Sequence, residues 1–318
     1  MLLPLRRLMS FSVQSFESPL AVEQVRVCLS ARFNRRVHTD AAVEQQAAQT
    51  WTELQRQSPR LFNASKFRLQ ALSDHHSQLQ LDWGLTDYAT YLGTCCSALA
   101  PRLLQDGRQS QQGDAFAFLS RKVGVAAVLE TADAHVALIQ RSKSVGLYQD
   151  LLDTPGGHPE PAHIQLTEDV LRTLEDEGHE DARRRLEDAA RDEFFRSIAT
   201  EVHEEVNVAP QLQQPPALLG VVLQTEACTP SFSFHIKTEC SAGQLRELYR
   251  AGPADKFESV KLVLLPSESL LAEGSATLDE LKLTPSAKGT LGLWKKHTLR
   301  ARQVSSAVYE SFGSHMRG

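Results

Sequence analysis

The sequence predicts an α/β protein, and two observations carry this prediction. Short apolar runs of strand length recur after residue 120, and segments with helical spacing or helix-favouring charge stand between them. The strand-like runs are Val123–Thr131, His135–Ser142, Ala217–Glu226, Ser231–Cys240 and Glu258–Pro266. With 318 residues, the chain has the length of one large domain or of two smaller ones.

The first part of the chain, residues 17–120, is predicted to be a smaller α+β domain. Val43–Leu61 has the apolar spacing of a helix, with Trp51 and Leu54 on one side. Lys66–Leu72 and Leu79–Leu85 alternate apolar and polar residues around a polar turn, which predicts a β-hairpin. A second helix is expected directly after it, with Thr86 or Asp87 as its N-cap.

The second part, residues 121–300, is predicted to be the larger domain. Its strand-like runs surround a loop that reads TPGGHPEP, at Thr154–Pro161, and a helical segment at Ser241–Gly252. The highly charged stretch 164–192 favours a helix, and we interpret it as a solvated insertion that either caps the site or extends into solvent. The remaining residues form a poorly defined N-terminal extension, 1–16, and a C-terminal tail, 301–318.

Charge and composition exclude several classes of function. A net charge of -5 gives no argument for binding nucleic acid or a membrane surface, and the longest apolar runs are too short to cross a bilayer. Five cysteines without CxxC spacing favour a reduced intracellular protein over a disulfide or zinc framework. We therefore expect a cytoplasmic protein, with the nucleus as the alternative and without mitochondrial targeting. No protein partner or oligomeric state follows from the sequence.

The most informative acidic residues are Glu201, Glu204 and Glu205. A helix places residues at i, i+3 and i+4 on one face, where like charges cost roughly 0.2–0.5 kcal/mol per pair. A divalent cation would offset this repulsion, and carboxylates suit the hard ions Mg²⁺ and Mn²⁺. The alternative is an acidic helix face in contact with water. Val202 and Val206 are expected to face the core beside these acids.

The loop upstream supports the metal interpretation. Gly156 and Gly157 follow a strand-like run, and glycine lets the backbone approach a phosphate or a metal closely. His158 could donate to a phosphate oxygen or orient a water, or it could be an ordinary loop histidine. Glu160 is either a ligand or a solvent-facing acid in a turn stiffened by two prolines. Loop and helix together predict a two-part site for metal-assisted attack on a diphosphate.

These two segments resemble the box of the Nudix hydrolases, GX5EX7REUXEEXGU, in which U is a bulky apolar residue. Gly157 corresponds to the first Gly of the box and Thr200–Val208 to its second half. In a regular box the Glu of the Arg-Glu pair lies 15 residues after that Gly, whereas Glu201 lies 44 residues after Gly157, so 29 residues are extra. Three positions depart from the box: Thr200 replaces Arg, Asn207 replaces the second Gly, and His163 replaces the upstream Glu.

Five segments narrow the resemblance to a Nudix subgroup with a similarly split box, which hydrolyses UDP-glucose and UDP-galactose with Mg²⁺. They read SKFRLQAL, GLTDYATYLGT, DTPGGHPEP, EVHEEVN and TPSAKGT. The resemblance implies a Nudix α/β/α sandwich with a mixed sheet behind an N-terminal domain, and UMP and sugar 1-phosphate as products. It also implies metal ligation by Glu201, Glu205 and Gly157, with Mg²⁺ or Mn²⁺ as the ion. Glu204 would bind the metal through a water, and Glu226 would be a further ligand or the general base; a plain surface position is the alternative for each.

Five residues are predicted to bind the nucleotide-sugar substrate. Arg68, Arg141 and Lys288 would neutralise the diphosphate, and His158 would contact a phosphate. Tyr88 could stack on uracil, as could Phe67, although Phe67 is also a good core residue. Two alternatives stay open: a Nudix hydrolase of ADP-ribose or a coenzyme A derivative, and a Nudix-fold protein that binds nucleotides without hydrolysis.

Overall fold

A computed structural model describes residues 9–59, 61–75, 78–142, 148–176, 178–225, 227–252, 259–272 and 277–315. Its larger sheet is mixed, because β10 pairs with β5 in parallel and the other neighbours pair antiparallel. The order is β1 (Phe11–Leu20), β9 (Ala217–Gln224), β10 (Thr229–Lys237), β5 (Gly124–Glu130), β6 (His135–Arg141) and β11 (Ser259–Pro266). Two short strands extend it, β7 (Leu152–Asp153) on β6 and β8 (Gly156–Gly157) on β5.

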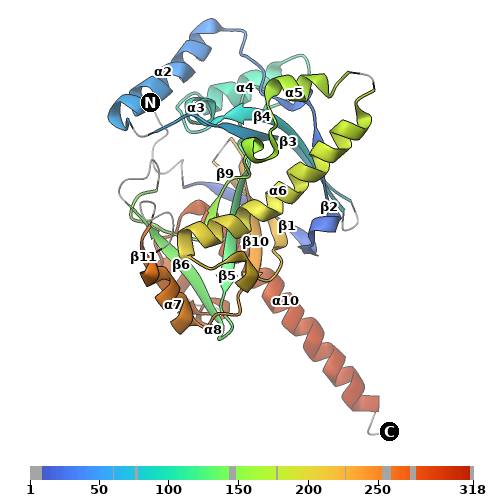
Figure 1. The fold of residues 1–318 in the computed structure, drawn as a ribbon, viewed down its shortest axis with the longest axis vertical. Helices are drawn as coiled ribbons and strands as arrows, with labels where there is room; N and C mark the ends of the chain where they lie inside the picture. Colours follow the sequence, from blue (N-terminus) through green and yellow to red (C-terminus); the bar gives the residue numbers. More distant parts are fainter. Residues whose placement is uncertain are drawn as a thin grey trace.

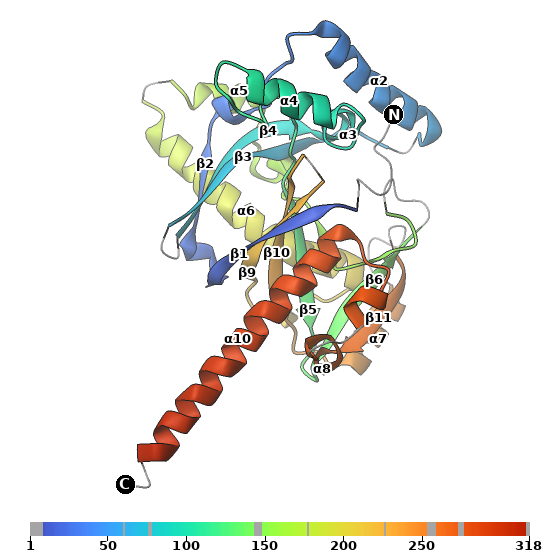
Figure 2. The same cartoon turned by 180° about the vertical axis from the view of Figure 1, so that it is seen from behind.

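Helices cover both faces of this sheet, as expected for an α/β/α sandwich (Figure 1). One face packs against α6 (Glu180–Val206) and α7 (Ala242–Ala251), and the opposite face against α8 (Ser267–Leu271) and α10 (Pro285–His315) (Figure 2). Successive residues of one strand pack on opposite faces of the sheet: Val221 of β9 packs on the α6 side, and Val222 on the α10 side. A short helix, α9 (Thr277–Glu280), lies between α8 and α10 in the chain.

The smaller unit is a three-stranded sheet in the order β2 (Val25–Leu29), β4 (Gln78–Asp87) and β3 (Ser65–His75). The antiparallel β3–β4 pair confirms the predicted hairpin. Three helices accompany it: α2 (Ala41–Gln57), α3 (Tyr88–Thr94) and α4 (Ala100–Gln109). Asp87 caps α3, accepting a hydrogen bond from the Thr90 N–H at 2.9 Å. Four 3₁₀ turns complete the described elements: Val22–Gln24, Ala31–Phe33, Pro161–Ile164 and Pro210–Leu212.

The charged stretch 164–192 is not the solvated insertion that we expected. It contains α5 (Glu168–Thr173) and the first half of α6, and it buries Leu166, Leu171 and Leu174 in the main hydrophobic cluster. Glu187 accepts the Leu29 N–H at 3.1 Å, and Glu175 accepts the Ala31 N–H at 2.9 Å. The stretch therefore packs against the small sheet, because its apolar residues and two of its acids have partners there.

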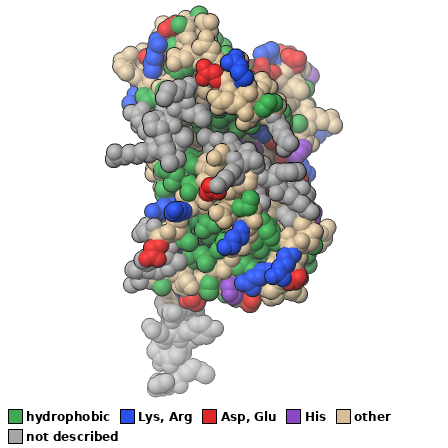
Figure 3. Space-filling model, turned by 90° about the vertical axis from the view of Figure 1, so that its left-hand side faces the viewer, with side chains coloured by type: hydrophobic (Ala, Val, Ile, Leu, Met, Phe, Trp, Pro, Cys, Tyr) green, Lys and Arg blue, Asp and Glu red, His purple; other side chains and the backbone are tan. Residues whose placement is uncertain are grey.

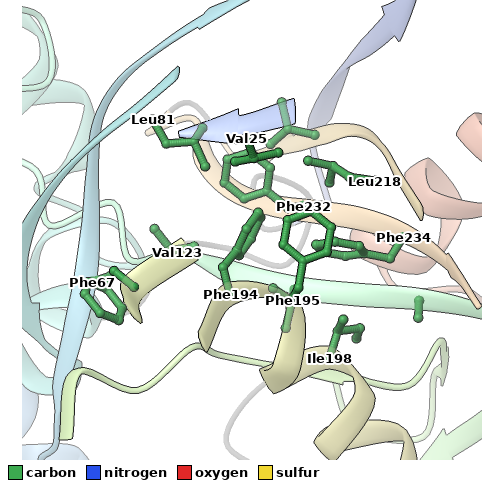
Figure 4. Packing of buried hydrophobic residues seen from close by; sticks show 14 of the residues in the cluster. Val25, Phe67, Leu81, Val123, Phe194, Phe195, Ile198, Leu218, Phe232 and Phe234 are labelled. Carbon is green, nitrogen blue, oxygen red and sulfur yellow. The ribbon is translucent and has the colours of Figure 1, made fainter. Parts of the chain in front are cut away.

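Aromatic rings from both sheets meet on α6. Phe194 lies 5.4 Å from Trp83 of the small sheet and 5.0 Å from Phe232 of the large sheet, measured between ring centroids. Figure 4 shows Phe194 between Phe67 and Phe232. One buried hydrophobic cluster thus contains residues of both sheets. The division into domains at residues 17, 121 and 301 stays a proposal.

Both ends of the chain contain more regular structure than we expected. Phe11–Phe16, placed in the poorly defined extension, begins β1, an edge strand of the large sheet. The proposed tail at 301–318 contains the end of α10, which continues to His315 and projects beyond the body of the protein (Figures 1 and 2). The start of β1 gave no clear signal because Phe11–Ser15 contains no fully buried side chain, so its apolar periodicity is weak.

The described helices do not include one that combines the length and the apolar character needed to cross a bilayer. On the face shown in Figure 3, basic and acidic side chains are scattered among apolar ones, and neither sign of charge forms a continuous band.

Candidate functional site

The Gly-Gly loop is fixed directly against the large sheet. Gly156 and Gly157 form β8, which pairs antiparallel with Ala126 and Val125 of β5. A Cβ atom on Gly156 would lie 2.5 Å from the Val125 carbonyl oxygen, so a side chain would separate the two strands. Pro155 accepts the Ala127 N–H at 2.8 Å and extends the pairing by one bond. The glycines are therefore needed for this close contact between loop and sheet.

The last two turns of α6 bring two carboxylates onto this loop. Glu205 is buried and accepts the Gly156 N–H at 2.8 Å. Glu201 is partly buried and accepts the His158 N–H at 3.3 Å. A Cβ atom on Gly157 would lie only 1.8 Å from the Glu201 Oε1 atom. The two halves predicted from the sequence therefore meet, although 43 residues separate His158 from Glu201.

The end of α6 explains one departure from the Nudix box. Asn207 has the left-handed conformation (φ 64°), which asparagine tolerates better than most residues, and its N–H donates to the His203 carbonyl. Its side-chain amide also donates to the Leu248 carbonyl at 2.8 Å. Asn207 thus supplies the helix end for which the box uses glycine.

The three glutamates of the helix do not share one environment. Glu205 is buried and Glu201 partly buried, whereas Glu204 is exposed to solvent. Val202 and Val206 are fully buried, as expected. The helix face that carries the three acids thus extends from the protein interior to solvent, and a role of Glu204 through a water on the metal stays a prediction. Glu226 lies outside the described residues.

The oxygen atoms gathered here fit a hard divalent cation. Glu201 and Glu205 offer carboxylates, and Gly157 offers a backbone carbonyl; Mg²⁺ prefers ligands of this type and keeps several waters. The described residues contain no group of three or more histidine, cysteine, aspartate or glutamate side chains that could hold a metal. A cation at this position would be held by these three groups, with waters or other oxygen atoms as its remaining ligands.

A cavity of about 180 Å³ opens beside the loop. Gly156, Gly157 and His158 form part of its wall. The other lining residues come from the small unit, from the segment β5 to β7, from the ends of β9 and β10 that face each other, and from the start of α10. They include Tyr88, Tyr91, Lys122, Arg141, Tyr148, Asp153, Thr229, Ser231, Thr284 and Ser286. Of the predicted substrate-binding residues, Tyr88, Arg141 and His158 are brought together here.

Arg141 enters the cavity already paired with a carboxylate. Its guanidinium lies 3.2 Å from Asp153, which also accepts the Thr284 hydroxyl at 2.7 Å. Burial raises the pKa of the Asp153 carboxyl, while Arg141 and Thr284 act in the opposite direction. Thr284 and Ser286 line the cavity, whereas the predicted Lys288 is exposed and is not among the lining residues.

Lys122 is a cation of the cavity that sequence reasoning missed. Its ammonium donates to His158 Nε2 and lies 4.5 Å from the centroid of the Tyr91 ring. Burial lowers the pKa of Lys122 to about 8, and Lys66 adds to the shift. Burial, followed by Lys122 and Lys66, holds the pKa of His158 well below its usual range, so this imidazole is neutral. The sequence does contain one indication of this position, a lysine directly before the apolar run that starts at Val123.

Arg68, predicted to bind the diphosphate, is not brought to the cavity. Its side chain is fully buried and donates to three backbone carbonyls, those of Leu119, Phe33 and Phe116, at 2.6–2.9 Å. Its guanidinium is thus committed to holding loops of the small unit together. Phe67 is likewise a core residue, with its ring 4.8 Å from that of Trp83.

Glu193 is a second residue that the sequence did not reveal. It is almost completely buried on α6, and it accepts the Glu160 N–H at 3.1 Å. It also lies 2.8 Å from His163 Nδ1 and 2.8 Å from Arg196. Glu160 itself pairs with Lys66. This network ties the loop to the helix in a chain whose box lacks both the upstream Glu and the Arg.

Comparison with known proteins gives the family. The chain is 32% identical over 283 residues to the uridine diphosphate glucose pyrophosphatase NUDT22 of Bos taurus, which covers 87% of this chain and 93% of that protein. It is 28% identical over 280 residues to Nudix hydrolase 9 of Arabidopsis thaliana, covering 86% and 84%. A solved MutT protein from Methanosarcina mazei Go1 aligns with 55% of this chain and 94% of its own, with a TM-score of 0.33 and 13% identity. No protein-family model matches the sequence. The identity along most of both chains shows that this protein belongs to the Nudix hydrolase family.

Proposed function

We propose that this protein hydrolyses the diphosphate bond of UDP-glucose and UDP-galactose in a Mg²⁺-dependent reaction. Water supplies the oxygen of a new P–O bond, the bridging P–O bond breaks, and the products are UMP and the sugar 1-phosphate. The similarity to the Bos taurus pyrophosphatase supports this substrate, since it extends over 87% of this chain.

The observation that carries the proposal is the contact between two carboxylates and the glycine loop. Glu205 and Glu201 accept N–H groups on either side of Gly157, next to a cavity that contains Lys122 and Arg141. Acidic groups for a cation and basic groups for phosphate oxygens thus lie around one loop, as hydrolysis of a diphosphate requires.

Glu201, Glu205 and the Gly157 carbonyl would hold the divalent cation. When bound, the cation supplies Lewis-acid stabilisation of charge on the phosphoryl oxygens and makes a water more acidic. The residues of the chain fix the geometry: Gly156 and His158 orient the two carboxylates through their N–H groups. Tyr88 and Tyr91 offer aromatic surfaces in the cavity, on which a base can stack.

A substrate panel tests the proposal. The purified protein is incubated with UDP-glucose, UDP-galactose, ADP-ribose and coenzyme A, with Mg²⁺ or with excess EDTA, and products are separated by anion exchange. We expect UMP and sugar 1-phosphate from the two UDP-sugars with Mg²⁺ and none with EDTA. Faster hydrolysis of ADP-ribose or coenzyme A would show that the substrate belongs to another class. No hydrolysis of any compound would indicate a protein that binds nucleotides without hydrolysing them.

A further inference from the structure

We propose that Lys122 binds a phosphoryl oxygen of the substrate diphosphate, and that it does so as the cation of the cavity without a carboxylate partner in the described chain. This proposal rests on the proposed function and names a residue that recognises the charged part of the substrate.

The backbone holds Lys122 at the junction of the two sheets. Lys122 forms a β-bridge with Arg68 of β3, and the next residue, Val123, donates its N–H to the Phe67 carbonyl at 2.8 Å. The side chain lines the same cavity as Gly157 and contacts His158, the residue that follows Gly157. A group that binds here therefore meets Lys122 and the glycine loop together.

The other cations near the loop are already paired. Lys66 forms an ion pair with Glu160, and Arg141 forms one with Asp153. Across the described residues, no carboxylate lies within ion-pair distance of Lys122. Its contacts are instead the imidazole of His158, through Nε2, and the face of the Tyr91 ring.

An ammonium group in this setting favours an anionic ligand. A partly buried charge that lacks a counter-ion is unfavourable, and an anion that enters the cavity removes this cost. The phosphoryl oxygens are the anionic groups of a nucleoside diphosphate sugar, whereas its base and its sugar are neutral. The contact that Lys122 makes best is therefore with the diphosphate.

The charge of Lys122 is expected to change near neutral pH. Lys66 faces it from β3, Glu160 and His158 from the loop, and Cys95, Cys96 and Tyr91 from α3 and the residues after it. Burial and Lys66 lower the pKa of Lys122 to about 8, so the free enzyme loses this charge as the pH rises above that value. Since kcat/KM reports on groups of the free enzyme, the contribution of Lys122 to kcat/KM falls there. Arginine keeps its charge throughout.

Binding measurements with three variants test the proposal. Lys122→Met removes the charge, Lys122→Arg keeps it, and Lys237→Met alters an exposed lysine at the opposite end of β10 from the cavity. Affinities for UDP, inorganic diphosphate and uridine are measured by calorimetry with Mg²⁺ at pH 7 and pH 9. Near-ultraviolet circular dichroism and thermal unfolding check that each variant folds.

For Lys122→Met we expect about 10- to 100-fold weaker binding of UDP and of inorganic diphosphate, the range of one charge-assisted hydrogen bond. Uridine binding should change less than twofold, and Lys237→Met should match the wild type. In Lys122→Arg, the loss of UDP affinity between pH 7 and pH 9 should be smaller than in the wild type. If Lys122→Met does not fold, this pH comparison decides the question.

Four results would overturn the proposal. In Lys122→Met, these are an equal loss of affinity for UDP and uridine, which would indicate a structural role, or an unchanged affinity for UDP. The other two are a pH dependence of UDP binding in Lys122→Arg identical to that of the wild type, and no binding of UDP or inorganic diphosphate by the wild type. Failure of the proposed function looks different: the wild type then binds diphosphates through Lys122 but does not release UMP from UDP-glucose.

Discussion

Replacing Gly157 by alanine should abolish activity with little effect on folding. A Cβ atom at this position would lie 1.8 Å from Glu201 Oε1 and 2.1 Å from its Cδ, whereas ordinary contact begins at 3.4 Å. The carboxylate oxygen must therefore retreat by about 1.6 Å, the difference between these distances. Displacements of about 1 Å in a catalytic group cost on the order of 100-fold in rate, so we expect at least that loss of kcat/KM for UDP-glucose.

The stability of Gly157→Ala should change by less than about 1 kcal/mol. The clashing atoms are the end of a flexible side chain, Gly157 is not among the described glycines with positive φ, and alanine restricts the unfolded chain. Gly156→Ala is the matched control, because its Cβ would lie 2.5 Å from the Val125 carbonyl oxygen, a backbone atom that cannot move alone. This variant should lose about 1–3 kcal/mol of unfolding free energy, the usual cost of overpacking.

Urea unfolding followed by tryptophan fluorescence, together with UMP release, separates the two effects. The reasoning fails if Gly157→Ala keeps kcat/KM within threefold of the wild type, because the position of Glu201 would then not matter. It also fails if Gly157→Ala is destabilised as much as Gly156→Ala, since the lost activity would then reflect unfolding.

The other variants test the roles of Arg68 and Glu193. Arg68→Met removes a donor from the carbonyls of Leu119, Phe33 and Phe116, of which the Phe116 carbonyl still accepts the Leu119 N–H. We expect a loss of at least about 3 kcal/mol in urea unfolding, with KM of the folded fraction unchanged. A raised KM at unchanged stability would instead support Arg68 as a substrate-binding residue. Glu193→Ala removes the acceptor of the Glu160 N–H, which should cost about 1–3 kcal/mol and lower kcat/KM about 10-fold or more by loosening the loop. Asp188→Ala, at an exposed position of the same helix, is its control, and equal effects of both changes would contradict the special role of Glu193.

Much of the fold could be predicted because its signals are local. The β3–β4 hairpin alternates in sequence, and the strands of the large sheet are apolar runs because both faces of that sheet are covered. The pairing of the Gly-Gly loop with the acidic helix could also be predicted, since the motif specifies which two segments meet. The 29 extra residues did not disturb this pairing, because part of them extends α6 and packs against the small sheet.

The missed residues act through contacts between distant segments. Arginine often binds phosphate groups, so the sequence suggested this role for Arg68. Its structural role follows from its burial beside the carbonyls of Leu119, Phe33 and Phe116. Lys122 becomes a candidate because the fold places its ammonium beside His158, 36 residues away. Glu193 lies among many acids of one charged stretch, and nothing local distinguishes it from those that face solvent.

The central claim is that the carboxylates of Glu201 and Glu205, held against the glycine loop, serve a Mg²⁺-dependent hydrolysis of UDP-sugars. Its most direct test is kcat/KM for UDP-glucose as a function of Mg²⁺ concentration in the wild type, Glu205→Gln and Glu204→Gln. Glutamine at 205 can still accept the Gly156 N–H but lacks the charge, and Glu204 is an exposed acid on the same helix turn. We predict a loss of at least about 100-fold in Glu205→Gln and a change of less than threefold in Glu204→Gln. Equal activity of Glu205→Gln and the wild type at every Mg²⁺ concentration would contradict the account.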